Sequence, residues 1–151
     1  MLLLLENSMG EFQKFFVSQV GILIRDSKCL ILEFSKSPGK WGLPGGRVDE
    51  GEGKEEAFRR EIKEELGIDE FQIHNTVDYD LFYVRPSKTV CGIVSYIENS
   101  SSEIILSDEH KSFAWVTEDE LDNYNFIWPT LSNMIKKGFE YHEKNKIKKA
   151  Q

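Results

Sequence analysis

Hydrophobic and polar positions in the first part of the chain follow the pattern of two neighbouring strands. Residues 12–25 (FQKFFVSQVGILIR) are rich in aromatic and β-branched side chains, which favour the extended backbone of a strand. Residues 26–28 (DSK) have the composition of a turn, and residues 29–34 (CLILEF) form a second apolar run. The pattern therefore predicts a β-hairpin over this part of the chain.

Three later runs have the same strand-like character. Residues 71–84 alternate between apolar and polar, residues 89–97 (TVCGIVSYI) are apolar almost throughout, and residues 112–116 (SFAWV) form a short last run. A strand whose two faces are both apolar is covered on both sides. We therefore expect residues 89–97 to be a central strand of the sheet.

A helical period marks residues 54–66. Phe58, Ile62 and Leu66 recur at every fourth position, which places them on one face of a helix. Gly67 fits the C-terminal cap, because glycine adopts the left-handed backbone conformation of that position without a steric cost. The pattern predicts a helix that packs its apolar face against the sheet.

The end of the chain predicts a second helix from near residue 129 to residue 141 or beyond, preceded by a short helix through residue 121 that Thr117 caps. Strands flank one helix and another closes the chain, so we expect an α/β fold with a mixed sheet between helices. We assign the domain to residues 12–142. Residues 1–11 are interpreted as a leader, too short in its leucine run for a signal peptide or a membrane span, and 143–151 as a basic, frayed tail.

Composition and charge narrow the classes of function. The 151 residues carry a net charge of -7, whereas proteins that bind nucleic-acid polymers through their phosphates are usually basic. An acidic protein still binds a small nucleotide when metal ions bridge the phosphates. Cys29 and Cys91 lie in apolar runs without a zinc-binding spacing, and we expect two buried free thiols. The expected location is the cytoplasm, with neither a membrane nor a nucleic-acid polymer as partner.

The helix predicted at 54–66 has a second face made of acids. Glu61, Glu64 and Glu65 stand at i, i+3 and i+4 and so share this face. An acidic helix face is most often simply solvated, but like charges this close repel one another, and a hard divalent cation would relieve the repulsion. The glycine turn at residues 44–46, just before the helix, lets the backbone approach a ligand closely.

The stretch 46–68, GRVDEGEGKEEAFRREIKEELGI, resembles the Nudix box, the signature of the Nudix hydrolase superfamily. The box reads G-x5-E-x7-R-E-U-x-E-E-x-G-U, where U is a bulky aliphatic residue. Gly46 begins it, Glu52 supplies the first acid, and residues 60–68 complete it with every specified position in register. Residues 41–45 (WGLPG) are similar to the family's usual lead-in. The resemblance implies an α/β/α sandwich, in agreement with the predicted elements.

The resemblance also implies roles for individual residues. Glu61, Glu64 and Glu65 would bind Mg²⁺, or Mn²⁺ in its place, together with the carbonyl of Gly45, whose missing side chain lets the backbone come close. Glu109 matches a glutamate that stands about six residues before a late tryptophan in some relatives, and would be a further metal ligand or the general base. Which of these four glutamates is the catalytic base varies within the family and is left open.

A second set of residues would support the site or hold the substrate. Glu52 and Arg60 would form an ion pair that fixes the loop against the helix, and Gly46 would belong to the same scaffold. Many relatives carry an arginine before the box that grips phosphate, and Lys36 and Lys40 stand in the corresponding loop here. A lysine serves there as a point charge without the bidentate fork of arginine.

Aromatic residues in the later strands have two interpretations. By their residue type alone, Tyr79, Phe82, Tyr83 and Trp128 are expected mostly in the core, although one or two could stack on a base. Tyr83 is also faintly similar to a tyrosine of the dinucleoside polyphosphate members, which makes it a candidate substrate-binding residue. His110 is expected to be a loop histidine rather than a catalyst.

Family members hydrolyse a nucleoside diphosphate linked to another moiety, and the resemblance implies this reaction here. The preferred hypothesis is a nucleotide pyrophosphohydrolase acting on a nucleoside or deoxynucleoside triphosphate. An ADP-ribose or dinucleoside polyphosphate hydrolase remains an alternative, as does a non-catalytic nucleotide sensor. An isoprenoid isomerase lacks support, because the hydrolase glutamates are all present and no cysteine adjoins the lead-in. Dimers are common among relatives, so a homodimer is left open.

Overall fold

The structure is a computed structural model that describes residues 12–86, 88–100 and 103–151. The expected leader at residues 1–11 lies outside the described residues. The described residues contain seven strands: β1 (Phe16–Arg25), β2 (Lys28–Phe34), β3 (Trp41–Gly42), β4 (Gly45–Arg47), β5 (Gln72–Arg85), β6 (Lys88–Glu98) and β7 (His110–Val116).

The seven strands form one mixed sheet organised around β1. The strand order is β3-β2-β1-β6-β5, with β4 paired to β1 and β7 paired to β2. β1 runs parallel to β6 and antiparallel to β4, and its last residues pair with the start of β2 in the predicted hairpin. β6 lies between β1 and β5, which confirms the prediction that residues 89–97 form a central strand.

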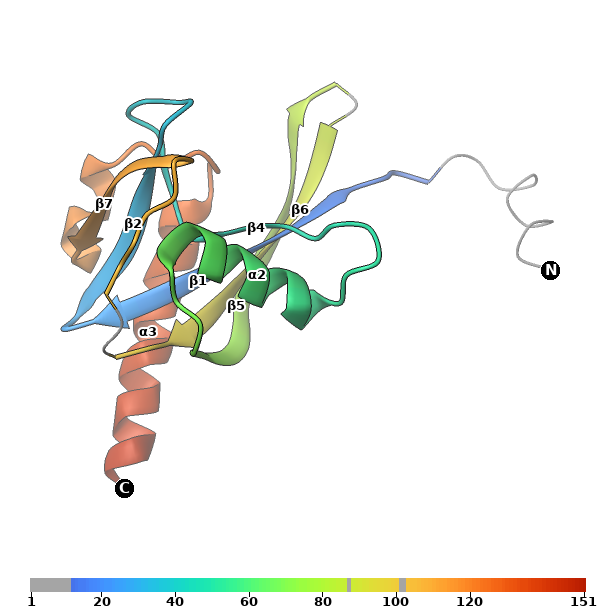
Figure 1. Cartoon of the computed structure of the whole chain (residues 1–151). Helices are drawn as coiled ribbons and strands as arrows, with labels where there is room; N and C mark the ends of the chain where they lie inside the picture. The colour runs from blue at the N-terminus through green and yellow to red at the C-terminus, as the bar shows by residue number, and fades with distance from the viewer. Residues whose placement is uncertain (1–11, 87, 101–102) are drawn as a thin grey trace.

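Helix α2 (Lys54–Leu66) has the predicted bounds and ends at the predicted glycine. Gly67 has φ 69°, and its N–H donates to the carbonyl of Lys63 at 2.9 Å. The apolar face of α2 packs on one face of the sheet, where Phe58, Ile62 and Leu66 join a buried cluster that includes side chains of β1, β2 and β6. In Figure 1, α2 (green) lies in front of the strands of this sheet.

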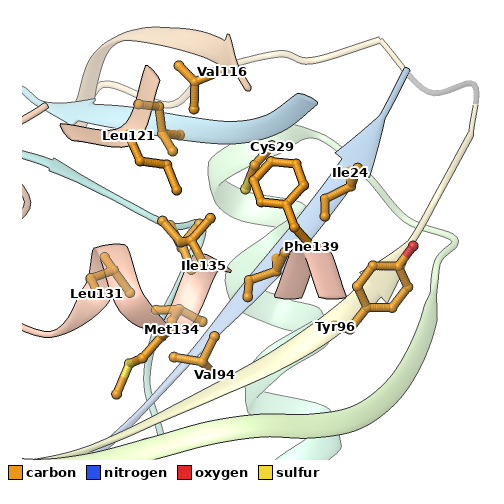
Figure 2. Packing of buried hydrophobic residues seen from close by; sticks show 14 residues of the cluster. Ile24, Cys29, Val94, Tyr96, Val116, Leu121, Leu131, Met134, Ile135 and Phe139 are labelled. Atoms are coloured by element: carbon orange, nitrogen blue, oxygen red, sulfur yellow. The ribbon is translucent and has the colours of Figure 1, made fainter. Parts of the chain in front are cut away.

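Helix α3 (Leu131–Ala150) covers the opposite face of the sheet, so the α/β/α sandwich is confirmed. Figure 2 shows side chains of α3, among them Ile135 and Phe139, packing against Ile24 and Val94 of the sheet. The helix comes close enough that a Cβ atom at Gly138 would lie 2.4 Å from Cδ1 of Ile22. The two helices therefore enclose the sheet between two hydrophobic cores.

The chain end differs from the expected frayed tail. α3 continues through Ala150, because residues 143–150 contain neither glycine nor proline and Lys149 forms an ion pair of 2.6 Å with Glu98 of β6. The short helix after Thr117 is present as the 3₁₀ helix η1 (Glu118–Asn123).

Both cysteines are free thiols as expected, but only Cys29 is buried and Cys91 is partly exposed. None of the described helices is long and apolar enough to cross a membrane.

Candidate active site

The glycine turn before α2 is held directly against β1. Gly45 has φ 135°, and a Cβ atom there would lie 2.1 Å from the carbonyl oxygen of Gln19, so only glycine fits. The N–H of Gly21 donates to the carbonyl of Pro44 at 2.8 Å. A Cβ atom at Gly46 would lie 2.4 Å from the carboxyl carbon of Glu61. The turn thus brings the backbone into contact with the acidic face of α2.

Arg60 ties the loop before α2 to the helix, as the predicted ion pair requires. Its guanidinium donates to both carboxylate oxygens of Glu52, at 2.6 and 2.9 Å, and to the carbonyl of Arg47 at 3.2 Å. Glu52 also accepts from the N–H of Asp49 at 2.9 Å. The hydrogen bonds from Arg60, followed by that from Asp49, lower the pKa of Glu52 to about 2, so this carboxylate is charged at any ordinary pH.

The same guanidinium reaches the acidic face. Nη1 of Arg60 donates to Glu61 at 2.8 Å and to Glu64 at 3.3 Å. Even so, the pKa of Glu61 is raised, because its partial burial outweighs the hydrogen bond from Arg60 and the charges of Glu64 and Glu109 add to the effect. Arg60 therefore neutralises only part of the negative charge gathered here.

Glu65 is the most deeply buried of these acids, only 4% exposed. One of its carboxylate oxygens accepts from the N–H of Gly45 at 2.6 Å. Burial raises the pKa of Glu65 to about 8, with further upward contributions from the charges of Glu61, Glu109 and Glu64. Without a cation, burial therefore favours the protonated form of Glu65.

His110 lies beside Glu65 in a strand and not in the loop where it was expected. It is the first residue of β7, its ring lies 5.2 Å from that of Phe34, and its Nε2 lies 3.8 Å from a carboxylate oxygen of Glu65. Burial lowers the pKa of His110. Neither ring nitrogen has a hydrogen-bond partner among the described residues, and the same holds for the buried hydroxyl of Ser107.

Glu109 reaches the site from outside the helix, as the resemblance implied. Its carbonyl accepts from the N–H of Ser35 at 2.9 Å, which fixes the backbone just before β7. It lines the same cleft as Glu61, Glu64 and Glu65, and its negative charge contributes to the raised pKa of Glu61 and Glu65. The structure therefore brings together all four glutamates that the sequence singled out.

These glutamates line a cleft of about 900 Å³, a volume suited to a small molecule. Much of the remaining lining is apolar or aromatic, and it also holds two further acids and two cations. The aromatic residues are Phe16, Phe34, Phe82, Tyr83 and Trp128, the further acids are Asp49 and Glu50, and the cations are Arg47 and Lys88.

The cations of the cleft are not the ones expected from the sequence. Lys36 and Lys40 do not line it, and Nζ of Lys40 donates to Asn125 at 3.0 Å. Arg47 and Lys88 take their place. No sequence signal identified either residue, although Arg47 directly follows the first glycine of the box.

The four aromatic residues that were expected mostly in the core are partly or largely exposed. Tyr83 lines the cleft and is 74% exposed, whereas Tyr79 is 65% exposed and does not line it. Phe82 and Trp128 are half-buried and both line the cleft. Of the four, it is therefore Phe82, Tyr83 and Trp128 that can contact a molecule bound there.

The donor set fits a hard divalent cation. Carboxylate oxygens are the ligands that Mg²⁺ prefers, and a cation beside Glu65 would favour its charged form. Glu61, Glu64, Glu65, Glu109 and the carbonyl of Gly45 are the groups that would hold it. Among the described residues, no three His, Cys, Asp or Glu side chains are already gathered as a metal cluster, and Arg60 holds two of the carboxylates.

Comparisons with known proteins agree with this geometry. A family model described as the NUDIX domain matches residues 16–137. Nucleoside triphosphatase NudI of Salmonella paratyphi B is 31% identical over 110 residues, a match that covers 67% of this chain and 78% of that protein. The MutT protein from Methanosarcina mazei Go1 has a similar structure, with a TM-score of 0.75, 23% identity, and coverage of 89% of this chain and 99% of that one. The E. coli ORF135 protein gives a TM-score of 0.72 at 23% identity, with coverage of 84% and 91%.

Proposed function

The chain belongs to the Nudix hydrolase family, and we propose that it is a Mg²⁺-dependent pyrophosphohydrolase of nucleoside triphosphates. The observation that carries this proposal is the cleft itself. Its lining combines the four glutamates of the predicted metal site with the aromatic side chains of Phe82, Tyr83 and Trp128. A molecule with a polyphosphate at one end and a flat ring at the other complements such a cleft. The name of the relative NudI, a nucleoside triphosphatase, supports the same class of substrate.

In this proposal, the residues on and around the acidic face of α2 are of two kinds, metal ligands and scaffold. Glu61, Glu64, Glu65 and Glu109, with the carbonyl of Gly45, hold the metal. Bound Mg²⁺ supplies charge neutralisation of the polyphosphate and activation of the attacking water. One of these glutamates would act as the general base for the attacking water.

The scaffold residues act by keeping the glutamates in place. Arg60 holds Glu52 through two hydrogen bonds, which tie the loop that follows the glycine turn to α2. Arg47 and Lys88, the cations of the cleft, are placed to attract the phosphates of the substrate. Tyr83 is a substrate-binding residue in this proposal, whereas Lys36 and Lys40 are not.

The test is a panel of candidate substrates incubated with the protein and Mg²⁺. The panel contains the common ribo- and deoxyribonucleoside triphosphates, ADP-ribose and a dinucleoside polyphosphate, and the products are separated by chromatography. We expect turnover of triphosphates to a nucleoside monophosphate and pyrophosphate. Preferred turnover of ADP-ribose or of the dinucleoside polyphosphate would mean that this compound, and not a triphosphate, is the substrate. No turnover, combined with a nucleotide-induced rise in Tm, would indicate a binding domain instead.

A further inference from the structure

A glycine in the middle of a central strand lies against two aromatic side chains of the cleft. Gly92 lies in β6, opposite Ser18 of β1 and Asp80 of β5, and it is buried. Glycine weakens the interior of a strand and often marks a close approach of another group. Here that group is the ring of Trp128, because a Cβ atom at Gly92 would lie 2.7 and 2.8 Å from two of its carbon atoms.

Phe82 completes this arrangement. Its ring centroid lies 5.0 Å from that of Trp128 at an angle of 51°, and a Cβ atom at Gly92 would also lie 3.1 Å from its Cε1. The two rings thus lie together over the same bare piece of backbone. Both remain half-buried and line the cleft, so part of their aromatic surface is available to a bound molecule.

The segment that carries Trp128 is fixed on both sides. Before it, the N–H of Ile127 donates to the carbonyl of Trp41 at 2.8 Å, and the N–H of Trp41 donates to the carbonyl of Asn125 at 2.9 Å. After it, the hydroxyl of Thr130 donates to Asp80 of β5 at 2.8 Å. The indole is therefore held in place before any ligand arrives, which reduces the entropy lost on binding.

We propose that Trp128 and Phe82 form the stacking platform for the base of the nucleotide, and that Gly92 is a positioning residue that lets the indole come close to the backbone of β6. The assignment of the ligand as a nucleotide rests on the proposed function. Every base presents an aromatic face, so such a platform binds the base without reading its hydrogen-bonding edge. A side chain at position 92 lifts the indole into the space that the base occupies.

The test compares two probes that differ in having a base. The first is α,β-methylene-ATP with Mg²⁺, which carries a base and a bridge that resists cleavage, and the second is inorganic tripolyphosphate with Mg²⁺. Dissociation constants are measured by calorimetry for the wild type, Trp128→Leu, Phe82→Leu and Gly92→Ala. Tyr79→Leu is the matched control, because this tyrosine is exposed on β5 and does not line the cleft. Circular dichroism checks that each variant folds.

We expect Trp128→Leu to weaken binding of α,β-methylene-ATP by about 5- to 150-fold, the range typical of a lost base stack, and to leave tripolyphosphate binding within about twofold. Phe82→Leu and Gly92→Ala are also expected to weaken binding of α,β-methylene-ATP, and Tyr79→Leu is expected to leave binding of both probes unchanged. If Gly92→Ala does not fold, Trp128→Leu and Phe82→Leu still decide the outcome.

Three results would overturn the proposal: no binding of α,β-methylene-ATP by the wild type, unchanged binding in Trp128→Leu, or equal losses for both probes. The third would mean that the rings only support the fold of the cleft. The outcome is separate from that of the proposed function. A wild type that hydrolyses no triphosphate but binds the analogue through Trp128 disproves the hydrolase proposal alone, whereas normal hydrolysis with unchanged binding in Trp128→Leu disproves the platform alone.

Discussion

Replacing Glu65 by glutamine should make the metal-free protein more stable at neutral and alkaline pH. The carboxylate of Glu65 is 4% exposed, and burial raises its pKa from the usual 4.5 to about 8. The unfolded chain releases this proton near pH 4.5, while the folded chain keeps it until about pH 8. The unfolded state therefore binds fewer protons over this window, and the free energy of unfolding falls as the pH rises.

The size of the effect follows from the two pKa values. One proton of difference changes the free energy of unfolding by about 1.4 kcal/mol per pH unit. Between pH 5 and pH 7.5, the titration of Glu65 should lower the free energy of unfolding of the wild type by about 3 kcal/mol. This is a large fraction of the stability of a domain this size. In Glu65→Gln the side chain stays neutral at every pH, and its amide oxygen can still accept the hydrogen bond from Gly45. The variant should not show this loss.

The assay is urea unfolding of both proteins in EDTA at several pH values between 5 and 8. Glu64→Gln is the matched control, because the side chain of Glu64 is 60% exposed and its charge remains solvated in the folded protein. We expect the wild type and Glu64→Gln to lose stability in parallel as the pH rises, with Glu65→Gln almost level. Parallel curves for all three proteins would refute the account of Glu65 as a buried acid that holds a proton.

Three further predictions concern the same site. Added Mg²⁺ should raise the Tm of the wild type more at pH 8 than at pH 6, because at the lower pH the ion must displace the proton of Glu65; an equal rise would argue against binding at this carboxylate. Arg60→Lys should lower kcat by about 10- to 100-fold at saturating Mg²⁺, because lysine cannot make the paired hydrogen bonds to Glu52. Steady-state kinetics measures this loss, and circular dichroism shows whether the variant remains folded. Gly46→Ala should lower kcat by about 100-fold and leave the Tm within a few degrees, since the new methyl group displaces the mobile end of Glu61; full activity would mean that this close approach has no catalytic importance.

The sequence predicted the parts of the site that depend on local pattern. The bounds of α2 follow from its apolar period and from Gly67, and both are as expected. The ion pair of Glu52 and Arg60 and the closeness of Glu109 to the acidic face followed from the family pattern. Each of these features is encoded by residues that stand at fixed spacings in the chain.

Features that depend on tertiary packing could not be predicted from the sequence. His110 was placed in a loop because the strand was expected to begin at residue 112, whereas β7 begins two residues earlier and turns this side chain inward beside Glu65. The direction of Arg47 is determined by the pairing of β4 with β1 and that of Lys88 by the β5–β6 hairpin. A single sequence does not show which strands meet at the rim of a cleft.

The contact between Trp128 and Gly92 could not be predicted for the same reason. Trp128 and Gly92 are 36 positions apart in the sequence, and neither spacing nor residue type connects them. Their contact arises because the segment before α3 returns across β6, where the missing side chain leaves room for the indole. Only the three-dimensional structure shows that the glycine and the tryptophan belong to one feature.

We propose that the acidic face of α2 binds the metal that hydrolysis requires. The most direct measurement is the rate of hydrolysis of the best substrate in the panel against Mg²⁺ concentration, for the wild type and for Glu64→Gln. We predict that the wild type is inactive in EDTA and recovers with Mg²⁺, and that Glu64→Gln loses most activity at every Mg²⁺ concentration while its circular dichroism spectrum is unchanged. Hydrolysis that persists in EDTA, or full activity of Glu64→Gln, would contradict the claim.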